Sequence, residues 1–450
     1  MSQNTFKILI ASVLVLFAIS SKAATYYVDP DNGKSEGDGS ESNPWKSLQE
    51  VFDNGFVKAT RWVAPYDDAK KAIETVNPDG FIVGGDTIYL LNGYHGQVQV
   101  NRLMNESSIT IQAKEGHSPR LSSLNIISSS NWTVKGLDVS SSHGSTSSNR
   151  LLEAAGHNWT GPSSNVVFEE NTVYSSPDIS GWSQNDWLEK AKSGIYLDAF
   201  NSIARNNKVS GIRFGIAAIS DNVLVEGNEI LNFSGDGIRG LGNDSRYIGN
   251  FIANGFKVDD NHDDGFQSWT HDGTPVENVI VDGNRVFYNY NHPNLSLISD
   301  IQGIGNFDGF SKNWVVRNNL VVINHWNGIS FYGAEDVEIY HNTVVDGDDD
   351  STMIPRILVH DHKDGTPSED IEIINNISRV SMASSDIKAK GNIEVDSKSA
   401  LFLDHENHDY TPRINTLANN SGEPIYSGTT DINGRERACS PEIGAFEAGW

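Results

Sequence analysis

The chain has 450 residues, a formal net charge of −26, 37% hydrophobic residues and one cysteine. This composition excludes a disordered chain, and the strong acidity argues against nucleic acid as a partner. Because Cys439 is the single cysteine, an intramolecular disulfide framework is excluded as well.

The N-terminus has the features of a secretory signal peptide. Lys7 precedes an apolar run at 8–19, and Ser21-Lys22-Ala23 follows as a small-residue cleavage site. The run is too short to span a bilayer as a mature helix. We therefore predict cleavage of residues 1–23, a secreted or periplasmic location without membrane attachment, and a mature chain of one domain at 24–450.

The segment at 60–80 lacks the repeat pattern of the residues that follow it. It contains VAPYDDAKKAIETVNPDG, which lacks the alternation of a strand repeat. We predict a helical or looped segment that contributes to an N-terminal cap.

An asparagine repeat runs through the rest of the chain. Six segments share an Asn or Asp, alternating apolar residues, and a second Asn six positions on: 165–173, 222–230, 278–286, 313–321, 336–344 and 370–378. Asn207, Asn228 and Asn250 recur every 21 or 22 residues. This interval suits one turn of a parallel β-helix, whose coils stack about 4.8 Å apart. We interpret the asparagines as turn residues that stack in a ladder and hold the coils in register.

A second motif, a glycine followed by an apolar residue, lies between the asparagines. It occurs as SGIY, FGIA, DGIR, DGFQ, QGIG and NGIS. Both motifs resemble those of right-handed parallel β-helix proteins. The segment YYVDPDNGKSEGDGSESNPWKSLQE and the C-terminal SPEIGAFE resemble the ends of secreted carbohydrate-active members. The predicted fold is all-β, a right-handed parallel β-helix of roughly 22-residue coils with an N-terminal cap.

Three coils carry insertions between the asparagine and the glycine that follows it. They lie between Asn171 and Gly194, Asn250 and Gly265, and Asn284 and Gly303. Because the insertions enter at the same position of the coil, we expect them to project along one edge and to wall a groove beside the Gly-Ile strands.

The alternation of these strands predicts which side chains point outward. If the residue after each glycine is in the core, the residues one and three further on face solvent. The outward positions include an amide and three aromatic residues suited to sugar contacts: Gln267, Trp269, Phe307 and Tyr332. Exposed aromatic residues in successive coils mark a binding surface or pack beneath the insertions.

Titratable residues gather beside these columns, and they suit β-elimination from a uronate polymer. The predicted catalytic residues are Tyr196, Arg213, Arg239, Lys257 and His262. Arginines could pair the substrate carboxylate, and Tyr196, Lys257 or His262 could move protons. In this respect the chain resembles β-helical alginate and pectate lyases. The resemblance implies a lyase that acts on an acidic polysaccharide such as alginate, and we expect a monomer without an organic cofactor.

A calcium site is a further expectation from resemblance. HDDGFQ resembles the calcium-binding DDGWD run of one pectate lyase family, with Asp236, Asp263 and Asp264 as oxygen ligands. Gln267 departs from that family, which has a third aspartate there.

The sequence is also compatible with three other functions. Asp236 with the pair Asp263-Asp264 repeats the carboxylate pattern of β-helical polygalacturonases, which are inverting hydrolases. A C5-epimerase would share the proton abstraction of a lyase. A β-helix that only binds glycans would need the aromatic column but not the titratable cluster.

Overall fold

The computed structural model describes residues 23–448 apart from 271, 293–294, 349–351, 384–385 and 427. The predicted signal peptide lies outside the described residues except for Ala23. Within the described part, no helix is long and apolar enough to cross a membrane.

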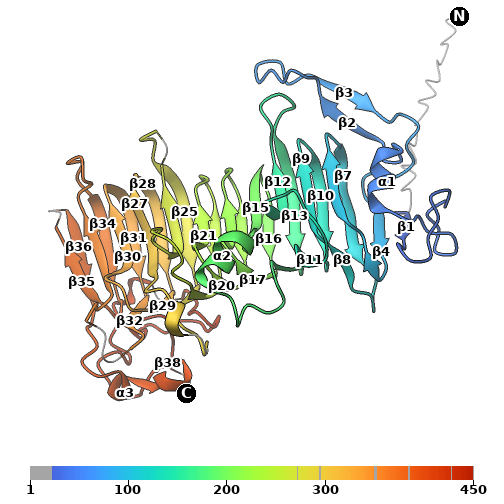
Figure 1. The fold of residues 1–450 in the computed structure, drawn as a ribbon. Helices are drawn as coiled ribbons and strands as arrows, with labels where there is room; N and C mark the ends of the chain where they lie inside the picture. The colour runs from blue at the N-terminus through green and yellow to red at the C-terminus, as the bar shows by residue number, and fades with distance from the viewer. Residues whose placement is uncertain are drawn as a thin grey trace, which may run out of the picture.

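The chain winds into an elongated parallel β-solenoid, as predicted (Figure 1). Each full coil contributes one strand to each of three faces, which we call face 1, face 2 and face 3 in chain order. Faces 1 and 3 join through the pairing of β13 with β15 into one 26-stranded sheet, and face 2 is a separate 10-stranded sheet.

Face 1 consists of β1 (Thr25–Val28), β4 (Thr87–Leu90), β7 (Met104–Ala113), β10 (Ser130–Lys135), β13 (Ser163–Glu169), β16 (Ile203–Arg205), β19 (Leu224–Glu226), β22 (Arg246–Ile248), β25 (Val276–Asp282), β28 (Ser311–Arg317), β31 (Ala334–Tyr340), β34 (Glu369–Ile374) and β36 (Ile387–Lys390). Face 2 consists of β5 (Gly93–Tyr94), β8 (Pro119–Leu121), β11 (Asp138–Ser140), β14 (Thr172–Tyr174), β17 (Lys208–Ile212), β20 (Glu229–Phe233), β23 (Phe251–Gly255), β26 (Arg285–Phe287), β29 (Leu320–Ile323) and β32 (Thr343–Asp346). Face 3 consists of β6 (Gln97–Asn101), β9 (Ser123–Ile127), β12 (Arg150–Ala155), β15 (Ser193–Phe200), β18 (Ile216–Ala218), β21 (Asp236–Gly240), β24 (Asp264–Trp269), β27 (Gln302–Asp308), β30 (Asn327–Tyr332), β33 (Arg356–His360) and β35 (Arg379–Met382).

The predicted asparagine ladder occupies the turn from face 1 to face 2. It is formed by Asn171, Asn207, Asn228, Asn250, Asn284, Asn319, Asn342, Asn376 and Asn392. At Asn228, Nδ2 donates to Asn250 Oδ1 at 3.0 Å and to the Ala204 carbonyl at 2.9 Å. Its Oδ1 accepts from the backbone N–H and the amide of Asn207. Every polar atom of this buried side chain is thereby satisfied, so a change of register would break several hydrogen bonds at once.

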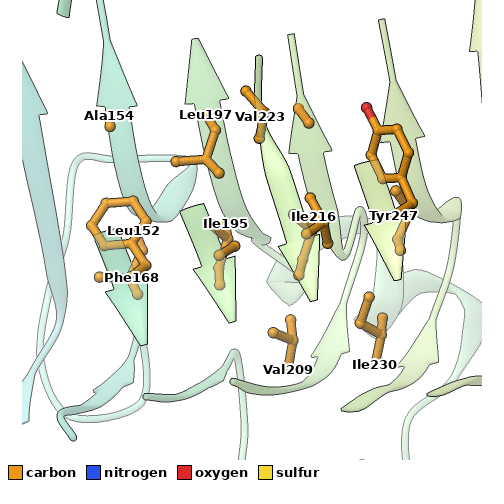
Figure 2. Close-up of a cluster of buried hydrophobic side chains, with 14 of the residues drawn as sticks. Leu152, Ala154, Phe168, Ile195, Leu197, Val209, Ile216, Val223, Ile230 and Tyr247 are labelled. Carbon is orange, nitrogen blue, oxygen red and sulfur yellow. The ribbon is translucent and has the colours of Figure 1, made fainter. Parts of the chain in front are cut away.

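The Gly-Ile strands of face 3 supply much of the core. Ile195, Ile216, Ile238, Phe266, Ile304 and Ile329 are all buried and pair in register from coil to coil. Figure 2 shows Leu152, Ile195 and Ile216 in a row, with Val209 and Ile230 of face 2 packed against them. The preceding glycine is needed because a methyl group at Gly215 would come within 2.3 Å of the Gly237 carbonyl oxygen.

The segment around 60–80 differs in part from the prediction. Residues 63–72 form a loop, as predicted, but on either side of it β2 (Ala59–Trp62) and β3 (Ile73–Val76) form an antiparallel pair, and Thr60 also pairs with Met104 of β7. The pair extends sideways from the N-terminal coils beside α1 (Leu48–Asp53) (Figure 1). Its outward strand is mostly exposed, which explains why it has no alternating apolar pattern.

The C-terminal segment leaves the solenoid and packs back along its side. It contains α3 (Lys398–Leu401), β37 (Phe402–Asp404), η2 (His405–Asn407), β38 (Asp409–Pro412) and η3 (Pro424–Tyr426). Its apolar residues, including Phe402 and Ile443, cover Phe287, Leu320 and Val345 of face 2. Face 2 is therefore shielded at this end, whereas face 3 remains available for a site.

The three insertions meet on one edge, as predicted. The first contains α2 (Gln184–Lys190), and the third contains η1 (Leu295–Leu297). Trp187 of α2 stacks on Phe256 of the second insertion at 4.7 Å between ring centroids. Phe256 in turn bridges to Ile298 of the third insertion. The insertions therefore form one packed wall where face 2 turns into face 3.

A substitution in the ladder tests its contribution to stability. Asn228→Ala should lower the free energy of unfolding by about 2–4 kcal/mol, because it leaves buried groups of Asn207 and Asn250 unpaired. The control is Asn222→Gly, which removes an exposed side chain bonded to Asn201 and keeps the positive φ of 55° accessible. For the control, urea denaturation should show a change in the free energy of unfolding of less than about 1 kcal/mol. Equal losses in both variants would contradict the role of the buried ladder.

Candidate functional site

Two buried aspartates form the base of the site on face 3. Asp236 begins β21 and Asp264 begins β24, and the two residues pair in register on adjacent coils. Both side chains are fully shielded from solvent. Like charges so close and so buried are costly, so each carboxylate requires a cation or a proton.

Arg239 supplies the cation for Asp236. Its Nε donates to Asp236 Oδ2 at 2.5 Å. The guanidinium carbon lies 3.5 Å from the ring centroid of Phe214 and 5.4 Å from that of Trp269. Arg239, which the sequence suggested as a partner for a substrate carboxylate, is thus held by Asp236 and two aromatic rings.

His262 is the partner of Asp264. Its Nδ1 lies 2.7 Å from Asp264 Oδ2, and Gln267 Nε2 lies 3.4 Å from the same nitrogen. The hydrogen bond to Asp264 raises the pKa of His262 above its usual value, against an opposing effect of burial. Burial raises the pKa of Asp264 to about 7. About half of the His262 side chain is exposed, so Nε2 can exchange a proton with a ligand.

A cavity of about 300 Å³ opens beside this pair, at the wall built by the insertions. It is lined by Lys257, His262, Asp263, Ile298, Ser299, Asp300, Gln302 and His325. Burial raises the pKa of Asp263 to about 6, offset in part by Ser299 and Lys257. Lys257 Nζ donates to the neutral backbone carbonyl of Asn261. The cavity therefore brings together a lysine, a histidine and a carboxyl that titrates near neutrality.

His325 is a cavity residue that the sequence analysis missed. The backbone N–H of Asn327 donates to its Nδ1 at 3.1 Å, which favours the neutral ring with the proton on Nε2. Burial lowers the pKa of His325. It lies one coil beyond Gln302, outside any motif, so only the stacking of coils could reveal it.

Three predicted catalytic residues, Tyr196, Arg213 and Arg239, are not among the residues that line the cavity. Tyr196 is on β15, three coils before β24 and about 14 Å away along the axis. Its ring is covered by Arg150, whose guanidinium carbon lies 3.3 Å from the ring centroid. Arg213 pairs with Asp259 at 2.9 Å. The structure thus groups Lys257 and His262 but not Tyr196.

The aromatic column is less regular than predicted. A bulge after Ser268 pairs Trp269 with Asp308, so Phe307 is out of step with it. The Phe307 ring folds over Gly305, where a methyl group would meet it at 2.2 Å. Phe307 lies 6.1 Å from Tyr332 between ring centroids. All three aromatic rings are half-buried rather than fully exposed.

The arrangement does not fit the expected calcium ion. Asp236 is neutralised by Arg239 and Asp264 is hydrogen-bonded to His262. Among the described residues, no group of three or more His, Cys, Asp or Glu side chains is placed to hold a metal. In the part of the chain that the structure describes, one oxygen of Asp236, one of Asp264 and both of Asp263 have no hydrogen-bond partner. The three side chains are nevertheless not placed to share one ion, so the proposed chemistry uses side chains alone.

The chain matches no known protein-family model and no curated protein sequence. Solved structures that resemble it include a pectate lyase, Pel9A, at 16% identity and a TM-score of 0.47, covering 95% of this chain and 97% of that one. XylC in complex with xylose covers 94% and 98%, at 10% identity and a TM-score of 0.49. The A-module of the mannuronan C-5 epimerase AlgE4 from Azotobacter vinelandii covers 70% and 89%, at 16% identity and a TM-score of 0.41. At these scores the likenesses decide nothing about activity, and the fold assignment rests on the strand ladders.

The raised carboxyl pKa values predict how stability depends on pH. From pH 4 the folded protein holds a proton on Asp263 up to about pH 6 and one on Asp264 up to about pH 7, whereas the unfolded chain has released both. Stability should therefore fall as pH rises through this range. Urea denaturation should show that the free energy of unfolding falls less between pH 5 and 8 in Asp264→Asn than in the wild type. The difference should be on the order of 1–3 kcal/mol.

The control for this measurement is Asp364→Asn. The pKa of exposed Asp364 is lowered to about 2 by hydrogen bonds from Thr366 and His362, so it is ionised throughout the tested range. The control should reproduce the wild-type slope. A wild-type slope in Asp264→Asn would show that Asp264 keeps an ordinary pKa.

Proposed function

We propose that the protein is a secreted polysaccharide lyase that cleaves a uronate-containing polymer by β-elimination, with alginate as the first candidate. The observation that carries this proposal is the cavity that brings Lys257, His262 and Asp263 together at the edge where face 2 turns into face 3. Such a reaction needs a cation for the C5 carboxylate, a base for the C5 proton and an acid for the departing O4.

Each requirement has a candidate in the cavity. Lys257, bonded to a neutral carbonyl, can neutralise the substrate carboxylate, whereas Arg213 and Arg239 are engaged by aspartates. Asp263, with a pKa near 6 and no well-formed hydrogen bond to either oxygen, is the proposed base. His262, with a raised pKa, is the proposed acid.

The proposed step is an elimination across C4 and C5 of the uronate. Asp263 takes the C5 proton, and the electron pair of the C–H bond forms the C4–C5 double bond. The C4–O4 bond breaks, and O4 receives the proton of His262 Nε2. Asp264 acts through His262 as a positioning residue, because its hydrogen bond fixes the ring and its ionised form favours the charged imidazolium. Neutral His325 can donate a hydrogen bond from Nε2 to a sugar oxygen.

The reaction class is tested with purified protein on alginate, pectate and glucuronan. The proposal predicts ultraviolet absorbance of the C4–C5 unsaturated product on one of these polymers, in step with new reducing ends. Activity that survives EDTA would agree with the lack of fit to calcium. New reducing ends without the absorbance would contradict β-elimination.

The roles of base and acid predict a bell-shaped pH profile. The value of kcat/KM should fall below about pH 6, where Asp263 is protonated, and again above the raised pKa of His262. Asp263→Asn and His262→Ala should each reduce kcat/KM by on the order of 10²–10⁴. The exposed Asp260→Asn serves as control and should retain wild-type values. Unchanged kinetics in Asp263→Asn would rule out its role as base.

Hydrolysis is a second candidate, favoured by one observation. Asp263 and Asp264 both have raised pKa values, and Asp236 lies one coil away, so a protonated and an ionised carboxyl can coexist near neutral pH. In that case the reducing ends would appear without the unsaturated product, and Asp264→Asn would be as damaging as Asp263→Asn.

A further inference from the structure

A second cavity lies at the opposite edge of face 3, where face 3 turns into face 1. It has a volume of about 350 Å³, and its lining includes Tyr66, His157, Asn158, Asp198, Phe200 and Ser220. These residues come from the β2–β3 connection, the loop between β12 and β13, the end of β15, and the loop between β18 and β19. None of them belongs to the cavity around His262.

The β2–β3 pair is fixed over this cavity by specific contacts. Trp62 Nε1 donates to the Pro162 carbonyl at 3.1 Å, and the Tyr66 N–H donates to the Trp159 carbonyl at 2.9 Å. Gly161, at φ +95°, allows the close approach, because a methyl group there would come within 2.3 Å of the Trp62 ring. The cavity is therefore preformed rather than a gap beneath a loose loop.

The aromatic residues at the cavity are exposed to an extent that needs an explanation. Phe200 is 49% exposed at the end of β15, and Trp159, next to the lining residue Asn158, is 58% exposed. Tyr66 is half-buried, with its ring held edge-on to Trp62 at 5.3 Å. Exposed aromatic surface beside a polar cavity is typical of a binding site. Flat rings can cover the C–H face of a sugar.

The polar groups indicate which sugar the cavity would accept. Asp198 accepts a hydrogen bond from Ser220 at 2.9 Å, and Asp68 accepts one from the Tyr66 hydroxyl at 2.9 Å. Carboxylates accept hydrogen bonds strongly from sugar hydroxyls but repel a uronate. The lining includes neither lysine nor arginine, and although Lys71 pairs with Asp68 at 3.5 Å, no described lysine or arginine forms an ion pair with Asp198 to offset its repulsion of a uronate.

We propose that this cavity binds a neutral sugar unit, as a carbohydrate-binding site separate from the site around His262. The inference rests on the proposed function only in taking a polysaccharide as the ligand. It implies that the protein engages a polymer, or a neighbouring cell-wall glycan, that carries neutral sugars as well as uronates.

The test is calorimetric titration of the full mature chain with hexasaccharides of xylose, mannose, glucose and galactose, beside hexasaccharides of galacturonate and mannuronate. At least one neutral hexasaccharide should bind, and Phe200→Ala and Trp159→Ala should each weaken that binding at least tenfold. The exposed Leu417→Ala, in the C-terminal segment, is the matched control and should bind as the wild type does.

The two sites are distinguished by measuring both cleavage and neutral-sugar binding in a variant of each site. His262→Ala should abolish cleavage and leave binding of the neutral hexasaccharide unchanged, whereas Phe200→Ala should leave kcat on a short uronate substrate unchanged. If the wild-type protein does not cleave any uronate polymer, the proposed function is overturned and this inference is not affected. The inference is overturned if no neutral hexasaccharide binds, or if binding survives in both Phe200→Ala and Trp159→Ala.

Discussion

The buried asparagine ladder is the constraint on which the rest of the structure depends. Each ladder asparagine except the last donates hydrogen bonds from its amide to the asparagine of the next coil and to a backbone carbonyl of the preceding coil. The coils therefore cannot slip by one residue without leaving buried polar groups unpaired. The same register holds on face 3, where strands pair from coil to coil and Asp236 lies beside Asp264, although an insertion separates the ladder from Asp264.

Both cavities beside face 3 lie where the solenoid departs from its repeat. The insertions pack on one another through Trp187 and Phe256, and this wall closes the cavity that contains Lys257 and His262. At the other edge of face 3, the β2–β3 pair builds the second cavity. Regular coils supply a rigid frame, and the additions supply walls that limit solvent and shift pKa values.

Much of the fold was predictable from the sequence, because the length of one coil can be read from the spacing of the repeated residues. The ladder asparagines, the buried column after each glycine and the common edge of the insertions all follow from spacing. Ion pairing was not predictable, since spacing cannot tell that Arg239 turns back to Asp236 or that Arg150 covers Tyr196. His325 has no motif of its own, and the bulge after Ser268 depends on local backbone geometry.

The most direct test of the account is a crystal structure of the Asp263→Asn variant with a bound uronate oligosaccharide. The proposed mechanism requires a sugar in the cavity at the insertion wall, with its carboxylate at Lys257 Nζ, its C5 facing residue 263 and its O4 within hydrogen-bond distance of His262 Nε2. A uronate chain bound elsewhere, for example along Tyr196 with the cavity empty, would contradict it.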